Sequence, residues 1–404
     1  MNSATPVALD GIRGLAFTRV LAGPYCTLSL GDLGAEIIKI EKPAGGDETR
    51  RFLPPDIDGE STYFLHVNRN KKSVVIDLSK PQGKALALEL AHRADVLVEN
   101  FRPGVMHRLG LDYDTVREGN EGIIYCSVSG SGTEGPHATR AGLDPVIQGE
   151  CGLMALTGEP DGEPMRIGVS LVDAMTGTFA SQAILAALVA RGRSGRGQRV
   201  EVSLFDTGVN MLVNFGAAYL MAGVEPERPG NGNLVAQPSG VYHAADGRLV
   251  VTCANQAAFE RLCGDVLDAP ELIDDPRFLD NPARLRHTEV LSDEINRRLG
   301  TASRAVWLER LRAAGIPGGE VRSVAEALGS DEFAARDLVT EVSHPTLGPL
   351  RQLRSPMRLD ETPCREPESA PTFGQHTREV LRAVLGYEDA ALDAWTDAGV
   401  IRGQ

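Results

Sequence analysis

The sequence predicts an α/β fold, with a doubly wound, Rossmann-like parallel sheet in a large domain and a smaller α+β domain after it. Two observations predict this architecture. Short apolar runs alternate with helical segments from residue 8 to about residue 206, which is the pattern of strand–helix–strand units around a parallel sheet. Beyond this point the alternation ends, and residues 225–237 are rich in Pro, Gly and Asn, which indicates a linker.

The composition limits the classes of function. The 404 residues suffice for two domains, and 42% hydrophobic with 24% charged residues is typical of a globular protein. A net charge of −14 argues against a general nucleic-acid-binding or membrane-surface protein, although a local basic site can still bind an anion. The N-terminus has no apolar signal core and the six cysteines form no C-x-x-C pair, so we expect a cytoplasmic protein. The scattered histidines predict no metal site.

The first strand–helix–strand unit is predicted over residues 8–41. Residues 12–17 form a short apolar run, residues 25–33 a helical segment, and residues 34–41 a buried strand that ends in an acid. An acid at this place is typical of dinucleotide-binding folds, in which it binds the ribose. However, only Gly23 stands where the G-x-G-x-x-G fingerprint is needed, which disfavours a nicotinamide-dependent dehydrogenase.

Basic and polar residues follow two of the predicted strands. Lys42 follows the strand at residues 34–41, and Asn100, Phe101 and Arg102 follow a strand predicted over residues 94–99. Because ligands of doubly wound sheets bind at the carboxyl ends of the strands, these residues are candidates for binding an anion with an aromatic group. A solvated loop remains the alternative. The other elements predicted before residue 130 are a strand at 74–78, a helix at 81–92 and a strand at 123–128.

An acid of ambiguous function lies between the predicted strand at 123–128 and the next helix. Asp144 stands directly before Pro145 in a segment that follows a glycine-rich loop at residues 129–132. An aspartate in this position often caps a loop through its own backbone. Support of an active site is the second explanation, and both remain open.

The most informative stretch covers residues 165–206. An apolar run at residues 167–172 predicts a strand, Asp173 closes it, and residues 174–190 predict a helix rich in alanine. A glycine turn follows, and alternating residues at 200–204 predict another strand. An aspartate at a helix start is most often a cap. The small residues around Asp173 leave room for a ligand, so this carboxylate is also a candidate active-site residue.

The second half of the chain has a different pattern. An apolar helix is predicted at residues 207–221, a hairpin turns at Asp246–Gly247, and helices follow at 256–267, 287–299 and 303–314. We expect these domain boundaries: a large ligand-binding domain at 1–206 with a returning segment at 370–404, a linker at 207–237, a small domain at 238–328, and a second linker at 329–369.

The order of these motifs resembles the class III CoA-transferase family, which includes formyl-CoA transferase, the carnitine CoA-transferases and 2-methylacyl-CoA racemase. Asp173 with its small-residue helix, the G-R-G-Q turn at 195–198 and the V-x-V-x-x-x-D strand at 200–206 are similar to the catalytic element of that family. The L-G-A-E-I-I-K-I-E run at 33–41 and the G-Q-H-T run at 374–377 extend the resemblance over residues 8–385.

The resemblance implies an acyl-CoA:carboxylate CoA-transferase that works through a CoA thioester formed on Asp173, with Asp144 supporting the site. CoA and acyl-CoA are then substrates, and no cofactor is permanently bound. The family members with a similar small domain favour succinyl-CoA as donor and a dicarboxylic acid as acceptor. The resemblance also implies an interlocked, ring-like homodimer. The CoA contacts that it implies are Leu21, Ala22, Lys42, Ile76, Ser79, Asn100, Phe101, Arg102 and Arg108.

Two positions depart from the family pattern. The racemase branch has a histidine before the aspartate, and this chain has Leu143, which cannot exchange a proton. A 2-methylacyl-CoA racemase is therefore the disfavoured alternative. The mobile glycine loop that covers the intermediate in the family is usually a run of glycines, and here only Gly230 and Gly232 stand in that segment.

Overall fold

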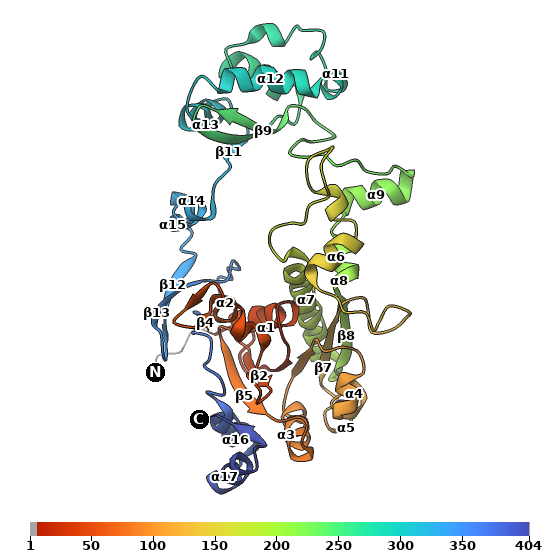
Figure 1. The fold of residues 1–404 in the computed structure, drawn as a ribbon, viewed down its shortest axis with the longest axis vertical. Coiled ribbons are helices and arrows are strands. Elements are labelled where there is room, and N and C mark those ends of the chain that lie inside the picture. Colours follow the sequence, from red (N-terminus) through yellow and green to blue (C-terminus); the bar gives the residue numbers. More distant parts are fainter. Residues whose placement is uncertain (1–5, 404) are drawn as a thin grey trace. The chain divides into compact units, whose positions relative to one another are not determined.

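The structure is a computed structural model that describes residues 6–403 (Figure 1). The chain forms two compact units. The first takes in the chain up to Leu153, Arg166–Ala217 and the chain from Asp337. The second is made of Met154–Met165 and Ala218–Arg336. Residues 337–369, expected as part of a linker, therefore lie in the first unit.

The first unit is built on a seven-stranded sheet with the order β14-β5-β2-β1-β6-β7-β8. All neighbours are parallel except β14, which pairs antiparallel with β5. Numbered along the chain, the six parallel strands stand in the order 3-2-1-4-5-6, so the order reverses between β1 and β6. The predicted parallel α/β sheet is confirmed. Its strands are β1 Arg13–Phe17, β2 Glu36–Glu41, β5 Lys71–Ile76, β6 Val96–Glu99, β7 Ile124–Ser129, β8 Gln198–Ser203 and β14 Ile401–Arg402.

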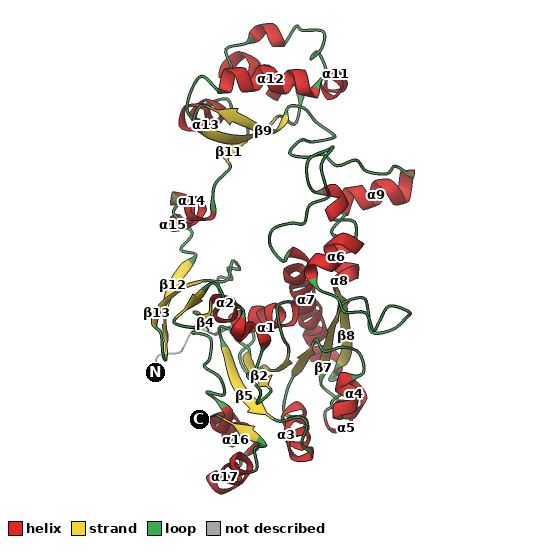
Figure 2. Ribbon diagram, viewed as in Figure 1, coloured by secondary structure: helices red, strands yellow, loops and turns green. Residues whose placement is uncertain are grey.

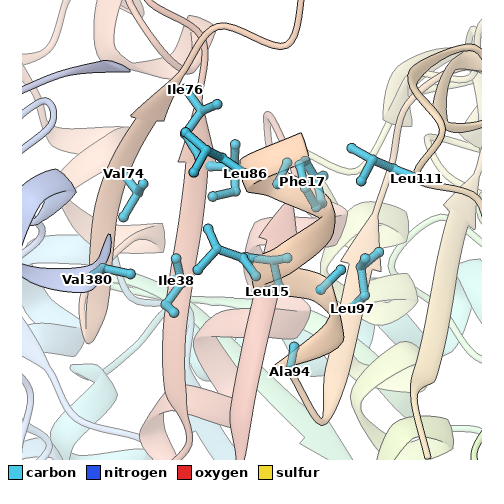
Figure 3. Close-up of a cluster of buried hydrophobic side chains, with 14 of the residues drawn as sticks. Leu15, Phe17, Ile38, Val74, Ile76, Leu86, Ala94, Leu97, Leu111 and Val380 are labelled. Carbon is cyan, nitrogen blue, oxygen red and sulfur yellow. The ribbon is translucent and has the colours of Figure 1, made fainter. Parts of the chain in front are cut away.

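Both faces of this sheet are buried, as alternation along β1 shows. Leu15 and Phe17 belong to one apolar cluster, and Ala16 between them belongs to the other. Figure 3 shows Leu15 beside Ile38 of β2 and near Leu86 of α3 (Pro81–His92). Helices α3, α5 (Tyr113–Gly119) and α16 (Thr377–Leu385) contribute to the first cluster. Helices α1 (Ala22–Asp32) and α7 (Leu171–Ser194) cover the opposite face (Figure 2). Two covered faces are typical of a parallel sheet.

The helix α7 (Leu171–Ser194) is the longest helix described. By length and composition alone it could cross a membrane, but it packs against α1 (Ala22–Asp32) and the sheet as a core helix. Gly177 permits this packing, because a Cβ built there would lie 2.6 Å from the carbonyl oxygen of Ala22. The backbones of α1 and α7 therefore touch one turn beyond Asp173.

The strand predicted at residues 167–172 is wrong. Residues 166–170 are irregular, and α7 begins at Leu171, so Asp173 lies in the first helical turn rather than at a strand end. The apolar Val172 is buried in the cluster between the sheet and α7, so it serves a helix face. The helix predicted from residue 25 also starts earlier, at Ala22, because Pro24 is tolerated in a first turn.

The C-terminal segment completes the first unit. β12 (Val339–His344) and β13 (Gly348–Leu353) form a hairpin, and α16 (Thr377–Leu385) and α17 (Asp389–Asp397) lead to β14. The hydroxyl of Thr377 accepts a hydrogen bond from the backbone of Val75 in β5 at 3.1 Å. α16 ends at Leu385, where Gly386 adopts a left-handed conformation as its cap.

The second unit has its own apolar core and a three-stranded sheet with the order β11-β10-β9. The predicted hairpin is confirmed as β9 (Ser239–Ala244) and β10 (Gly247–Thr252), closed by β11 (Gly318–Glu320). Its helices are α10 Gln256–Arg261, α11 Asn281–Arg286, α12 Thr288–Leu299, α13 Arg304–Ala313, α14 Val324–Leu328 and α15 Asp331–Ala335.

The remaining elements are short. The single helix predicted at residues 207–221 is wrong, because Val213, the first residue of α9, adopts a φ of +46° and so separates α9 from α8. The other bounds are α2 Thr62–Val67, α4 Val105–Leu109, α5 Tyr113–Gly119, α6 Asp144–Glu150, α8 Leu204–Asn210, α9 Val213–Ala222, β3 Asp56–Ile57 and β4 Glu60–Ser61.

The close contact between α1 and α7 predicts how adding one methyl group at Gly177 changes the stability of the fold. Gly177→Ala should destabilise the fold by about 1–3 kcal/mol, because the added Cβ forces the two backbones apart. Gly192→Ala in the same helix is the matched control, since a Cβ there meets no atom within 4 Å. It should stabilise α7 by up to about 1 kcal/mol. Chemical denaturation of both variants measures the difference, and equal effects would contradict the close packing.

Candidate active site

Asp173 stands in the first turn of α7 with an unengaged carboxylate. The helix has no side-chain cap at Ser170, and the backbone N–H of Asp173 instead donates to Oδ2 of Asp144 at 3.1 Å. Within residues 6–403, no hydrogen bond or ion pair engages the carboxylate of Asp173 itself. The expected capping function therefore falls to Asp144, and the Asp173 carboxylate is left available for chemistry.

Asp144 is held in place by a buried glutamine. It is the first residue of α6 and is 2% exposed. Gln148 donates from Nε2 to Oδ1 of Asp144 at 2.6 Å, and its Oε1 accepts the backbone N–H of Ile167 at 2.8 Å. The two interactions join α6 to the segment before α7, so the distance between the two acids is fixed by buried hydrogen bonds.

The two acids influence each other electrostatically. Burial, and after it the negative charge of Asp144, together raise the pKa of Asp173 to about 7. The same negative charges act on Tyr63 of α2, which is half-buried. Burial raises the pKa of its phenol, and the charges of Asp173, Asp47 and Asp144 raise it further. A perturbed carboxylate beside a cavity is a physical marker of a functional site.

Asp173 opens into a cavity of about 320 Å³, here called the Asp173 cavity. It lies at the carboxyl ends of the strands where the strand order reverses, which is where doubly wound sheets bind ligands. The residues that line it besides Asp173 are Arg19, Val20, Leu21, Ala22, Glu48, Asn100, Phe101, Arg102, Pro103, Val128, Ser129, Gly130, Arg140, Ala141, Gly142, Leu143 and Leu204.

A second cavity of about 330 Å³ lies next to it, at the ends of β1, β2 and β5; we call it the β2–β5 cavity. Arg19 and Phe101 line both cavities, and the Arg19 guanidinium stacks over the Phe101 ring at 4.8 Å. Glu48 accepts hydrogen bonds from Arg19 at 2.8 Å and from Lys42 at 3.1 Å. Two cations are thereby oriented at the boundary of adjoining cavities, as an elongated anionic ligand requires.

The structure brings most of the sequence-predicted binding residues to these two cavities. Leu21, Ala22, Asn100, Phe101 and Arg102 line the Asp173 cavity. The β2–β5 cavity is lined by Lys42, Ile76 and Ser79, together with Phe101.

Apart from Asp144, three predicted residues do not line either cavity. Arg108 is exposed on α4, and its carbonyl accepts a hydrogen bond from Lys84 at 3.2 Å. Gly230 and Gly232 belong to the second unit, where Gly230 adopts a φ of +58° against Pro160.

Sequence reasoning missed two arginines and a tyrosine. Arg19 lies two residues after the first strand, so its position just beyond a strand end is a usable signal. Arg140 and Tyr63 come from segments without a motif, and only the fold brings them near Asp173. Leu143, which stands in the histidine position of the racemase branch, lines the Asp173 cavity and is 58% exposed.

Residues 9–377 match the model of CoA-transferase family III. The chain belongs to this family. A mouse succinyl-CoA:glutarate CoA-transferase is 39% identical over 97% of this chain and 90% of its own length. An acetyl-CoA:oxalate CoA-transferase from Acetobacter aceti is 40% identical over 84% and 88%. The crystal structure of a CaiB/BaiF family protein from Brucella suis superimposes with a TM-score of 0.86 at 35% identity, covering 94% of this chain and all of that one.

These comparisons establish that the chain is a class III CoA-transferase, whose substrates are CoA thioesters and carboxylic acids. The resemblance seen in the sequence is confirmed. Within residues 6–403, no group of three or more His, Cys, Asp or Glu side chains is arranged to hold a metal ion.

The pKa of Asp173 predicts how transferase activity depends on pH. A carboxylate attacks only when ionised, so kcat/KM for the acyl-CoA should fall as the pH drops through about 7. Asp144→Asn removes the nearby charge while keeping an oxygen for the Asp173 N–H, so the midpoint should move to lower pH. Burial still acts on Asp173, and the midpoint should stay above 4. A pH–rate profile with an unchanged midpoint would contradict this electrostatic coupling.

Proposed function

We propose that this CoA-transferase moves CoA from succinyl-CoA to a dicarboxylic acid such as glutarate, through a thioester formed on Asp173. The observation that carries the proposal is the unengaged carboxylate of Asp173 at the wall of a cavity that adjoins a second, cation-bordered cavity. The name of the mouse relative supports the pair of acids. The Acetobacter relative, named for acetyl-CoA and oxalate, marks the other substrate pair to be tested.

The proposed reaction is a sequence of acyl exchanges. Asp173 attacks the donor thioester, which gives a mixed anhydride and CoA thiolate. The thiolate attacks the aspartyl carbonyl, releases succinate and leaves an aspartyl-CoA thioester. The acceptor carboxylate displaces the thiolate to form a new anhydride, and the thiolate then attacks the acceptor carbonyl and restores Asp173. Each step exchanges one acyl bond for another, so neither ATP nor a redox partner is consumed.

The two cavities suggest where CoA binds. The Asp173 cavity would hold the thioester, and the β2–β5 cavity the nucleotide end. Arg19 and Lys42 stand at their boundary, and CoA phosphates would take hydrogen bonds now directed at Glu48. Phe101 offers an aromatic surface to both cavities. In this proposal Ile76, at the end of β5, and Ser79, just beyond it, contact the nucleotide.

Asp144 would support the reaction without touching the substrate. By holding the first-turn N–H of α7, it leaves the Asp173 carboxylate unpartnered. Its charge also keeps the pKa of Asp173 near neutrality, after the larger effect of burial. Water must stay away from the anhydride and the thioester, because hydrolysis of either intermediate would end the transfer.

We further propose that the enzyme is a cytoplasmic homodimer whose chains interlock as rings. The helix α9 supports an oligomer, because none of its residues is buried and Leu220 and Met221 are 84% and 87% exposed. Apolar patches of this kind are usually covered by a partner. The six cysteines are free thiols, as in proteins of reducing compartments.

The nucleophile is tested by Asp173→Asn, which keeps the shape of the side chain but removes the ionised carboxylate. Transfer from succinyl-CoA to glutarate should fall by about 10⁴-fold or more, as when other covalent nucleophiles are removed. CoA affinity should stay within a few-fold, since the cations of the two cavities are unchanged.

Mass spectrometry supplies the matching evidence. Wild-type enzyme incubated with succinyl-CoA should gain the mass of CoA minus water, and the variant should not. Retained turnover in Asp173→Asn would reject the covalent mechanism. Proton exchange at C2 of a 2-methylacyl-CoA, measured beside transfer, would revive the racemase alternative.

The second carboxylate of a dicarboxylic acid needs a cation, and we propose Arg140. Of the three arginines that line the Asp173 cavity, Arg19 is engaged by Glu48 and Phe101, and Arg102 directly follows the proposed nucleotide contact Phe101. Arg140 comes from the loop that leads into α6, and its guanidinium pairs with the partly exposed Glu150 at the surface. A ligand carboxylate could accept hydrogen bonds from the same guanidinium of Arg140.

Arg140→Gln should raise the KM for glutarate by about 10- to 100-fold, the worth of one charge-assisted hydrogen bond. Valerate, which has the same chain length but one carboxylate, should be affected much less. Arg102→Gln serves as the control and should instead raise the KM for acyl-CoA with either acceptor. Equal losses for glutarate and valerate in Arg140→Gln would exclude Arg140 from acceptor recognition.

A further inference from the structure

The segment between β1 and α1 holds a residue in a strained conformation. Val20 has a φ of +63°, a left-handed conformation that β-branched residues rarely adopt. The segment Thr18–Val20 also forms a wall between the two cavities, because Thr18 lines the β2–β5 cavity, Val20 the Asp173 cavity, and Arg19 both. Strain of this kind persists only where surrounding contacts impose it.

Three side chains impose this conformation through hydrogen bonds to successive backbone groups. Lys39 donates from Nζ to the carbonyl of Thr18 at 2.7 Å. The amide of Asn100 accepts from the N–H of Arg19 at 2.8 Å and donates to its carbonyl at 2.7 Å. Oδ1 of Asp47 accepts the N–H of Val20 at 3.4 Å. The main chain from Thr18 to Val20 is therefore fixed by residues from β2, from the end of β6 and from the loop after β2.

Lys39 and Asp47 also bind each other. Their charged atoms lie 2.7 Å apart, and their side chains are 0% and 1% exposed. Burial alone would raise the pKa of Asp47, but the Lys39 ammonium and hydrogen bonds from Thr49 hold it below its ordinary value. Since removing two charges from water offsets most of their attraction, a buried pair is a weak source of stability. Its retention at this place calls for a different explanation.

We propose that the buried Lys39–Asp47 pair is a positioning device for acyl transfer, which holds Val20 in its left-handed conformation and so aligns Leu21 and Ala22 with Asp173. The inference rests on the proposed function of Asp173. Leu21 and Ala22 follow Val20 directly and line the cavity into which Asp173 opens.

The packing of α1 against α7 fixes the other end of this segment. Ala22 begins α1, and its carbonyl lies against Gly177, one turn after Asp173 in α7. A rotation at Val20 would move the wall of the cavity while α7 stayed in place. Because reactivity depends on near-attack geometry, a shift on the order of 1 Å can lower the rate about 100-fold.

The test removes the pair without leaving a charge unpaired. In Lys39→Met/Asp47→Leu, both tethers to the segment are lost. We expect kcat for transfer to fall about 100-fold, with the KM for succinyl-CoA changed less than about fivefold. The matched control is the buried pair Arg69–Asp32, whose guanidinium and carboxylate lie 2.7 Å apart away from both cavities. Arg69→Met/Asp32→Leu should keep kcat within twofold even where it lowers the melting temperature.

A rescue variant separates positioning from stability. Adding Val20→Gly to the Lys39→Met/Asp47→Leu variant removes the steric cost of positive φ, so kcat should recover about tenfold. No recovery, or a fall in kcat no larger than in the control pair, would overturn the proposal. An inactive wild type would reject the proposed function instead. Amide hydrogen exchange over residues 18–24 would then test whether the pair positions this segment. The proposal requires faster exchange than in wild type in Lys39→Met/Asp47→Leu, and an unchanged rate in Arg69→Met/Asp32→Leu.

Discussion

One side chain joins the two strands between which the sheet reverses its order. The amide of Asn100, directly after β6, pairs with both polar backbone groups of Arg19, two residues after the end of β1. The chain leaves β1 and β6 in different directions at this reversal point, and the backbone hydrogen bonds between the two strands end there. The side chain of Asn100 then connects the two segments. The walls of both cavities, the direction of α1 and the stacking of Arg19 on Phe101 all depend on this connection.

The proposed chemistry depends on different roles for two acids, Asp144 and Asp173. A helix start ordinarily engages its nearest carboxylate as a cap, which would quench a nucleophile. Here Asp144, from another helix, takes the first-turn N–H, so that Asp173 stays free and its pKa rises to about 7 through burial and then repulsion. The site thereby keeps a carboxylate that is more basic, and thus more nucleophilic, than an exposed aspartate.

Sequence reasoning succeeded where local pattern and interior packing agree. The helix at Pro81–His92 and the hairpin around Asp246–Gly247 follow from a proline start and a tight turn. It failed at residues 167–172, where a short apolar run was taken for a strand although Val172 packs within a helix. Arg140 and Tyr63 could not be found, because their relation to Asp173 arises from loops and helices distant in the chain.

The sequence by itself determined the family and the parallel α/β sheet and made Asp173 the candidate nucleophile, because motifs and alternating apolar runs are local properties of the chain. Only the tertiary structure decided what Asp173 can do. Its missing hydrogen bond, its raised pKa and the cavity beside it come from Asp144 and from the ends of β1 and β6. Burial and electrostatic fields sum over residues far apart in sequence, so no local pattern encodes them.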